Sequence, residues 1–426
     1  VKAIGINTSL CVLFVLLTTL VVTPILLSIG RTKKPKSRDE KVSCLAQLSM
    51  SIGDFALRHS KSVSAIFVIV SVVLALGTFK VEPAFDMERT MGKKVPYVNS
   101  LLEVSKSELG SLYSYDVMIE FPEDGDAKRP ASMTQLERLS DYAAKMKLTK
   151  RTTSILDILK DLNQTLNGGE KSFYAIPSNE DEIAQMLLLY ENAGGTESEY
   201  WMDYDYRRLR LMVEIENFNS AETERELAEL EAEAKKMFPD AKVTMVGNLP
   251  QFTTMMQYLV RGQVQSFFLS VLIIGLILMI VFQSVRVGLI GLIPNLFPAI
   301  CVGGYMGYMN IPLDMMTACI IPMILGMAVD DTIHFITHSK LEYVRTGHYR
   351  TAIRNTFHVV GTAIITSSLI TSAVFATFST SVCEQFKNFG ILSVIGIMAA
   401  LIADLFITPI LVYKFHVYGK EKNINK

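Results

Sequence analysis

Seven long apolar segments constrain the fold of this chain more than any other feature of its sequence. A helix that crosses the roughly 30 Å hydrocarbon layer of a bilayer needs about 17–25 mostly apolar residues. Such segments lie at Ile4–Ile29, Ser62–Phe79, Val264–Gln283, Arg286–Tyr308, Met315–His338, Phe357–Phe378 and Phe389–Tyr413. Charged residues make up 19% of the 426 residues, less than the about 25% of typical soluble domains. The sequence therefore predicts a polytopic α-helical membrane protein.

The spacing of these segments predicts how the chain is divided. We expect a transmembrane helix in 1–30, a cytoplasmic linker in 31–61, a second transmembrane helix in 62–79, a polar domain in 80–262, a five-helix transmembrane bundle in 263–414 and a tail in 415–426. Within the linker, Cys44–Arg58 has apolar residues at helical spacing, which predicts an amphipathic helix. Such a helix is either a connector or a sensor of the membrane surface.

Basic residues are concentrated in alternate connections between the apolar segments. The linker holds six between Arg31 and Lys41, the connection after the fifth segment holds four between Lys340 and Arg354, and the tail holds further lysines. Short loops rich in Lys and Arg stay on the cytoplasmic side, so residues 80–262 are expected outside and the C-terminus inside. Residues 80–262 contain no cysteine, whereas secreted eukaryotic domains often carry disulfides. We therefore expect the cytoplasmic (inner) membrane of a prokaryote.

The polar domain has the pattern of an α+β fold. Alternating apolar and polar residues predict strands at Tyr115–Phe121, Arg210–Glu216 and Lys242–Val246. Helical periodicity predicts helices at Thr134–Met146, Thr153–Leu166, Glu180–Glu191 and Ala221–Met237. Asn219 and Glu222 are spaced as a capping box for the last of these helices. The order of elements favours ferredoxin-like split βαβ units.

One short internal repeat links the first and last apolar segments. Both contain Thr-Pro-Ile-Leu, at Thr23–Leu26 and at Thr408–Leu411. Two apolar helices can share such a tetrapeptide by chance, but duplication about an axis along the membrane normal is common in transporters. Because the sequence starts at Val1 rather than at a methionine, we expect a piece of a longer protein, with residues 1–30 as the last helix of an earlier repeat.

The sequence GMAVDDTIHF places two adjacent acids, Asp330 and Asp331, inside the fifth apolar segment. Each charged residue at the centre of a membrane helix costs about 2.5–3.5 kcal/mol on insertion scales, and adjacent like charges cost more. His334 follows four residues after Asp330, on the same helical face. The pattern predicts a site for a proton or, as the less favoured ion, sodium; the alternative is a polar cluster that only joins helices.

Hydroxyl groups on the next apolar segment are candidate partners of these acids. Thr366, Ser367 and neighbouring hydroxylated residues extend to Ser372. Small hydroxylated residues serve close helix packing in membranes, so packing and hydrogen bonding to the acids both remain open. Asp404 in the last segment is a third intramembrane acid, which either faces the interior or caps a helix contact.

Several classes of function are disfavoured by the sequence. The net charge of −1 argues against nucleic-acid binding, which needs a basic field. There is no CxxC motif and no phosphate-binding GxxxxGK[ST] loop, so neither a structural zinc site nor internal ATP hydrolysis is indicated. No arrangement of a Ser, His and Asp nucleophile is visible. We expect no enzyme activity and no cofactor.

The run GMAVDDTIHF, preceded by FQSVRVGLIGLIPNLFPAICVGGYMG and followed by the C-terminal Thr-Pro-Ile-Leu, resembles the resistance–nodulation–division (RND) permease superfamily. More narrowly, it is similar to the branch that contains mycobacterial-membrane-protein-large (MMPL), hopanoid and Patched-like transporters. The resemblance implies an RND permease half, namely the sixth helix and the second repeat. It implies that Asp330 and Asp331 match the proton-relay acids, with Thr366–Ser368 beside them.

The resemblance also implies a function, which is export of hydrophobic or amphiphilic, lipid-like molecules driven by the proton-motive force. Expected partners are that substrate, membrane lipids and the missing N-terminal repeat, with a homo-oligomer as an open alternative and no nucleic acid. The matching acids of the fourth helix are expected in the missing repeat. Two other functions stay open: a protein-export auxiliary like SecD and SecF, and a lipid-binding regulator of the sterol-sensing type.

Overall fold

The computed structural model describes residues 2–29, 44–82, 87–107, 111, 113–195, 198–216, 218 and 220–421. Seven of the described helical segments are long and apolar enough to cross a membrane. They are Ile6–Ile29, Ser60–Thr78, Asn248–Phe282, Val285–Tyr308, Thr317–Thr346, Tyr349–Thr380 and Glu384–Lys414. The predicted fold class, a polytopic helical membrane protein with a small α+β domain, is confirmed. The basic linker between Arg31 and Lys41 and the capping residue Asn219 lie outside the described residues.

The chain divides into two compact units, residues 1–44 and 45–426. The first unit contains α1 (Lys2–Ile29), an apolar helix with Pro24 in its interior. Its side chains are exposed from Ile6 to Ile29 within the structure. A helix with such a surface is stable in lipid but not in water, because lipid covers its apolar side chains.

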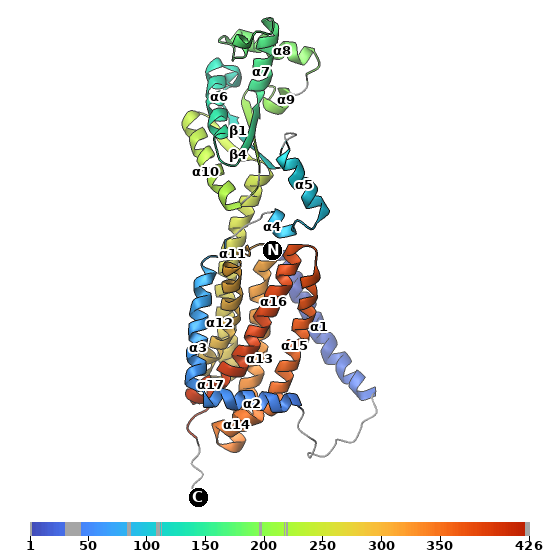
Figure 1. Cartoon of the computed structure of the whole chain (residues 1–426), viewed down its shortest axis with the longest axis vertical. Coiled ribbons are helices and arrows are strands. Elements are labelled where there is room, and N and C mark those ends of the chain that lie inside the picture. Colours follow the sequence, from blue (N-terminus) through green and yellow to red (C-terminus); the bar gives the residue numbers. More distant parts are fainter. Residues whose placement is uncertain are drawn as a thin grey trace. The chain divides into compact units, whose positions relative to one another are not determined.

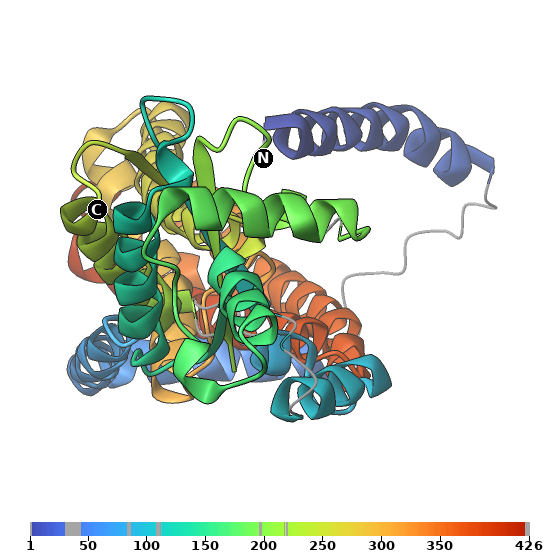
Figure 2. The same ribbon diagram turned by 90° about the horizontal axis from the view of Figure 1, so that it is seen from above.

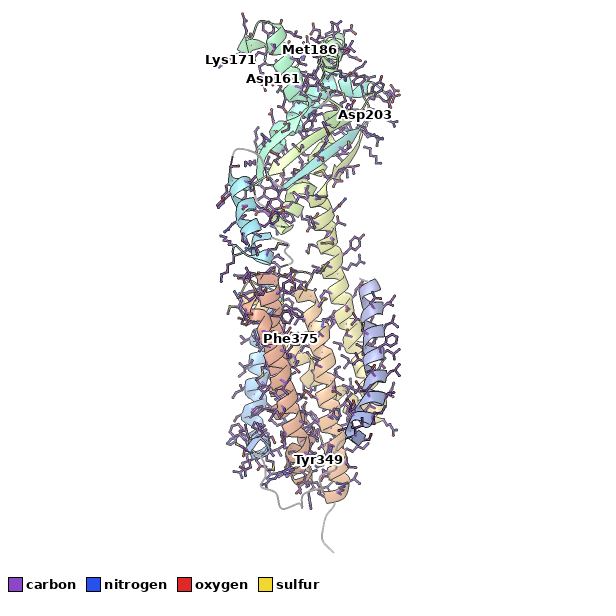
Figure 3. All side chains as sticks on the ribbon, turned by 90° about the vertical axis from the view of Figure 1, so that its right-hand side faces the viewer. Asp161, Lys171, Met186, Asp203, Tyr349 and Phe375 are labelled. Carbon is purple, nitrogen blue, oxygen red and sulfur yellow. The ribbon has the colours of Figure 1, made fainter. Side chains whose placement is uncertain are left out.

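The membrane helices of the second unit form one bundle (Figure 1). Its members are α3 (Ser60–Thr78), α11 (Asn248–Phe282), α12 (Val285–Tyr308), α13 (Thr317–Thr346), α14 (Tyr349–Thr356), α15 (Thr362–Ala376), α16 (Glu384–Ile402) and α17 (Thr408–Lys414). Tyr349 and Phe375 lie toward opposite ends of this bundle (Figure 3). Two π-helical turns, Phe357–Gly361 and Ala403–Ile407, join α14 to α15 and α16 to α17. Each π turn inserts an extra residue into an otherwise continuous helix.

Glycines bring α12 into close contact with α3. A Cβ on Gly77 of α3 would lie 2.7 Å from the carbonyl oxygen of Gly304, and a Cβ on Gly307 would overlap the carbonyl oxygen of Gly77. The Tyr308 hydroxyl donates a 2.6 Å hydrogen bond to the carbonyl oxygen of Val73. Close backbone approach at small residues is the usual means of helix association in membranes.

A short helix, α2 (Cys44–Arg58), packs against the π turn at Phe357. The Ser49 hydroxyl donates a 2.8 Å hydrogen bond to the Phe357 carbonyl oxygen, and Gly53 lies against the Phe357 ring. The opposite face of α2 carries exposed Leu48 and Phe55. One face of this helix is therefore engaged in protein packing and the other is free to contact lipid.

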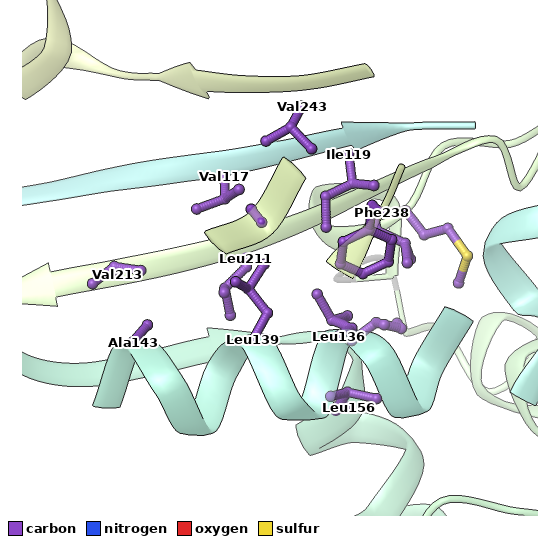
Figure 4. Close-up of a cluster of buried hydrophobic side chains, with 14 of the residues drawn as sticks. Val117, Ile119, Leu136, Leu139, Ala143, Leu156, Leu211, Val213, Phe238 and Val243 are labelled. Atoms are coloured by element: carbon purple, nitrogen blue, oxygen red, sulfur yellow. The ribbon is translucent and has the colours of Figure 1, made fainter. Parts of the chain in front are cut away.

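The α+β part, here called the sheet domain (residues 113–246), holds a four-stranded antiparallel sheet of order β2-β3-β1-β4. The strands are β1 (Tyr113–Glu120), β2 (Thr149–Ser154), β3 (Arg208–Ile215) and β4 (Lys242–Val246). With α6 (Pro130–Ala144) after β1 and α10 (Ser220–Met237) after β3, the order is that of the ferredoxin-like fold. Figure 4 shows Leu136, Leu139 and Ala143 of α6 facing the apolar side chains of the strands.

The sequence-based prediction missed one strand of this sheet. β2 occupies Thr149–Ser154, and the helix predicted from Thr153 begins instead at Ile155 as α7 (Ile155–Leu166). The strand TKRTTS lies at the sheet edge, where its side chains are mostly half-buried and polar, so it lacks an apolar alternation. Ser154 ends the strand and caps α7, with Asp157 completing a capping box.

Between β2 and β3 the chain inserts α7, α8 (Glu180–Asn192) and α9 (Ser198–Trp201). α7 packs against both other helices, shown in green in Figures 1 and 2. Two further short helices, α4 (Met87–Met91) and α5 (Pro96–Lys106), precede β1. Short 3-10 turns complete the described elements at Asp126–Lys128, Lys171–Phe173 and Thr377–Thr380.

One continuous helix, α11, belongs to both the sheet domain and the bundle. α11 contributes Leu249 and Phe252 to the core of the sheet domain, and Leu278 and Phe282 to the core of the bundle. It runs without a break through Gly262, where the sequence predicted the domain boundary. An unbroken helix between two cores can transmit a displacement of one to the other.

We predict that Gly307→Val weakens the contact between α3 and α12. The new side chain meets the Gly77 backbone, and overpacking of this kind costs about 1–3 kcal/mol. The thermal midpoint of the detergent-solubilised protein should fall by several degrees. Gly262→Val in α11 is the matched control, because nothing lies within 4 Å of its Cβ position. Equal midpoints for the two variants would contradict the packing described here.

Candidate functional site

The acid pair lies on α13, whose start is fixed by a buried capping residue. The Asp314 carboxylate accepts hydrogen bonds from the backbone N–H groups of Met316 and Thr317, at 2.9 and 2.8 Å. Burial raises the pKa of Asp314, and these hydrogen bonds act in the opposite direction. From this start, Asp330 and Asp331 lie near the middle of a 30-residue helix, about the depth at which a charge costs most in a bilayer.

The two acids face different surroundings. The Asp330 side chain is 74% exposed within the structure, and its Oδ1 lies 3.5 Å from Nε2 of His334, one turn later on α13. The Asp331 side chain is half-buried and lines a cavity. Adjacent residues on a helix point about 100° apart, so one acid faces outward while the other faces α15 and α16.

The cavity beside Asp331 has a volume of about 180 Å³ and lies between α13, α15 and α16. Its polar lining comes from Asp330 and Asp331 on one side and from Ser367, Ser368 and Thr371 on the other. Ile397 and Ala400 of α16 contribute apolar surface. This volume is large enough for a few water molecules, which polar walls can hold. No Lys or Arg is among the described residues that line it.

The structure places the two predicted hydroxyl partners, Ser367 and Thr366, in different surroundings. Ser367 lines the cavity together with Asp331, although its hydroxyl donates a 3.0 Å hydrogen bond to the Ile364 carbonyl oxygen. Thr366 is exposed and does not line the cavity, and its hydroxyl donates to the Thr362 carbonyl oxygen at 2.8 Å. Both hydroxyls are therefore used within α15 in this conformation. Direct hydrogen bonds to the acids would require a change of rotamer or a bridging water.

Asp404, the third intramembrane acid, faces the interior of the bundle. It lies in the π turn between α16 and α17 and is 1% exposed. Its Oδ1 accepts hydrogen bonds from the hydroxyls of Thr332 and Thr408, at 2.7 and 3.0 Å. The Thr332 hydroxyl also lies 3.4 Å from Oδ1 of Asn295 on α12. These four residues form a polar network directly behind the acid pair, because Thr332 follows Asp331.

Sequence reasoning missed Thr332, Thr408 and Asn295 as parts of this network. One signal was present: Asn295 is an amide inside the apolar run of α12, between Pro294 and Pro298. Polar residues inside membrane segments usually mark interior contacts. Their convergence on one acid depends on the packing of three segments and the π turn, which periodicity does not reveal.

One face of α13 is left uncovered within the structure. Gly326, Asp330, His334, Thr337 and Leu341 are all exposed, and their spacing of three or four residues places them on one helical face. We call this set the α13 stripe. Charged groups in membrane helices almost always face protein or a water-filled cavity, so contact of this stripe with lipid tails would be unfavourable.

This geometry can bind and release a proton at membrane depth. Two neighbouring carboxylates repel each other, and protonation of one removes both the repulsion and much of the burial cost. The cavity offers water and hydroxyl groups through which a proton can move. The three cavity-lining helices come from consecutive parts of the bundle, so a change of charge at Asp331 acts on their contacts.

Comparison with known proteins agrees with this architecture. A model of the MMPL family matches residues 127–415, which include strands β2, β3 and β4 of the sheet domain and the acid pair. The putative membrane protein MJ1562 of Methanocaldococcus jannaschii is 23% identical over 395 residues, covering 87% of this chain and 95% of that protein. That relative is therefore about as long as this chain.

Among solved structures, the hedgehog release protein Disp of the water bear Hypsibius dujardini has a similar fold. The TM-score is 0.50 at 12% sequence identity, and the match covers 88% of this chain. It covers 48% of the Disp chain, so this chain spans about half the length of that protein. This similarity of fold agrees with the RND-type architecture that the sequence predicted.

The family match covers more than half of the chain and contains the membrane-embedded acids, the cavity and three of the four strands of the sheet domain, β2, β3 and β4. The chain therefore belongs to the MMPL family.

Proposed function

We propose that this protein exports hydrophobic or amphiphilic, lipid-like molecules across or out of the cytoplasmic membrane, driven by the proton-motive force. The observation that carries the proposal is the position of Asp331. Its carboxyl group lies in the middle of a membrane helix and lines a cavity between three helices that is large enough for a few water molecules. An ionisable group at that depth is expensive, and in membrane proteins such groups mark ion pathways.

In this proposal Asp331 carries the proton. The negative charge of Asp330 repels the ionised Asp331 carboxylate and so favours its protonation. His334, 3.5 Å from Asp330, relays protons along the α13 stripe. Ser367 lines the cavity opposite Asp331 and stabilises the charged form through water or a change of rotamer. Thr366, one position earlier on α15, comes into contact with the acids when α15 rotates. Protonation then favours an arrangement of α13, α15 and α16 that the charged acid disfavours.

Substrate movement is assigned to the sheet domain and its junction with the bundle. α11 belongs to the cores of both parts, which supports mechanical coupling between them. By the positive-inside rule, the basic residues between Lys340 and Arg354 belong on the cytoplasmic side. The sheet domain then lies outside the inner membrane of a prokaryotic cell. A lipid-like substrate fits a protein whose transport machinery is reached from the membrane.

We predict that the double variant Asp330→Asn/Asp331→Asn lowers efflux of NBD-labelled phosphatidylethanolamine at least tenfold. The assay uses cells that express the intact protein, with and without an uncoupler. Neutral amides cannot exchange protons, so the variant should behave as wild type does in the presence of the uncoupler. Asp161→Asn in α7 is the control, because this acid is exposed and distant in sequence from the membrane helices.

Other outcomes of the same assay distinguish the alternatives. Export by a correctly inserted double variant at the wild-type rate would contradict the proposal and make the acids structural. No efflux even from wild type, together with lipid binding that is independent of the acids, would favour a sterol-sensing-type regulator. Copurification with the protein-export channel would favour a SecD- or SecF-like auxiliary.

We further propose that another repeat of the same kind covers the α13 stripe. This repeat is either another part of a longer chain or a second copy of this one. The exposure of Asp330 and His334 at membrane depth supports the proposal, because the cost of exposing them to lipid disappears in a protein contact. The Thr-Pro-Ile-Leu repeat is consistent with a duplicated architecture.

Coverage of the stripe predicts weak contact with lipid. A bimane label at Thr337→Cys, on the stripe, should be quenched much less by brominated lipids than the same label at Ile273→Cys, an exposed position of α11. The five native cysteines are first replaced by serine. Equal quenching at the two positions would mean that the stripe faces lipid, which contradicts the proposed cover.

A further inference from the structure

The geometry points to Asp404 as a second proton-binding site, in which a protonated carboxyl is held inside the bundle and takes part in the transport cycle. This inference rests on the proposed proton-driven export and adds a group to it. Asp404 belongs to the π turn between α16 and α17, whereas the acid pair belongs to α13. It is 1% exposed and does not line the cavity beside Asp331.

The orientation of Asn295 is the first step of the argument. Its side-chain Nδ2 lies 2.7 Å from the carbonyl oxygen of Gly291, to which it donates a hydrogen bond. The opposite orientation of the amide would place two acceptor oxygens against each other. Oδ1 of Asn295 therefore points toward Thr332, at 3.4 Å from its hydroxyl oxygen, and needs a donor there.

The second step counts hydroxyl protons. Thr332 lies between two acceptors, Oδ1 of Asn295 and Oδ1 of Asp404, but its hydroxyl has one proton. If Asp404 were ionised, that proton would be taken by the carboxylate and the buried Asn295 oxygen would lack a donor. If Asp404 is protonated, it donates to Thr332, Thr332 donates to Asn295 and Thr408 donates to Asp404. Only the protonated form provides the Asn295 oxygen with a donor while it keeps the hydrogen bond between Thr332 and Asp404.

The third step considers the charges around Asp404. The π turn packs against α3, α12, α13, α16 and α17, and α13 places the Asp331 carboxylate next in sequence to Thr332, whose hydroxyl contacts Asp404. The charged residues of α3, α12, α16 and α17, which are Lys61, Arg286, Glu384, Lys387 and Lys414, lie at the ends of their helices. No described cation pairs with Asp404, and the one acid that faces it disfavours its ionisation.

Because both acids are negative when ionised, ionisation of Asp331 disfavours ionisation of Asp404, and the reverse also holds. Thr332 hydrogen-bonds Asp404 and adjoins Asp331 in sequence, so the two acids are joined by a short polar path. Protonation of Asp331 removes a negative charge that disfavours ionisation of Asp404, in addition to the burial and hydrogen bonding that also disfavour it. The proton then passes from the Asp404 carboxyl to a carboxylate or water nearer the cavity, and Asp404 becomes the charged member. The π turn, a feature often found at functional sites, places Asp404 at this position.

Infrared difference spectroscopy of the purified, reconstituted protein tests the assignment. The wild type should show a carbonyl band of a protonated carboxyl group that Asp404→Asn removes and that Asp330→Asn, which keeps the Asp331 carboxylate, retains. Gradient-driven movement of NBD-labelled phosphatidylethanolamine should fall at least tenfold in Asp404→Asn, with an unchanged melting temperature. Asp161→Asn should match the wild type in every measurement.

Three results would overturn the inference. The first is the absence of any band that depends on Asp404, which would mean that the acid is ionised. The second is loss of the band with transport within twofold of wild type, which would make the proton structural. The third result applies if Asp404→Asn does not fold. In that case Thr332→Val should shift the band and Thr332→Ser should not, and an unshifted band in Thr332→Val would overturn the inference. A wild type that moves no probe refutes the proposed export instead, while the infrared result still reports the proton.

Discussion

Moving a charged carboxylate to the centre of a bilayer costs about 2.5–3.5 kcal/mol on insertion scales, and this bundle holds three acids at such depth. Each one is accommodated differently. Asp331 lines a polar cavity, Asp404 is enclosed by hydroxyls and an amide, and Asp330 lies on an exposed stripe beside His334. The first two solutions are built into the fold, and for the third we propose that another repeat covers the stripe.

Helix packing separates a fixed part of the bundle from a part with room to rearrange. Gly77, Gly304 and Gly307 bring the backbones of α3 and α12 together, which leaves no free volume between these helices. The cavity instead lies among α13, α15 and α16. A charge that changes beside this cavity acts on the contacts of these three helices, and α11 belongs to the cores of both the bundle and the sheet domain.

The spans, the acid pair and the ferredoxin-like class follow from residue patterns, because length, burial cost and strand alternation are local properties of the sequence. β2 escaped prediction because an edge strand with polar side chains has no apolar alternation. Thr366 and Ser367 are equivalent in the sequence, and only the helix rotation seen in the structure places Ser367 at the cavity. The network of Asp404 depends on a π turn and on α12 and α13, which no local pattern specifies.

Proton-driven export requires that proton flux accompany substrate movement, and both can be measured in the same vesicles. Vesicles containing the intact protein and a pH-sensitive dye in the lumen receive NBD-labelled phosphatidylethanolamine under an imposed pH gradient. Proton-driven export through Asp331 predicts that probe movement and lumenal pH change together in the wild type, and that Asp331→Asn abolishes both. Probe movement at the wild-type rate with no accompanying change of pH would contradict a proton-driven mechanism.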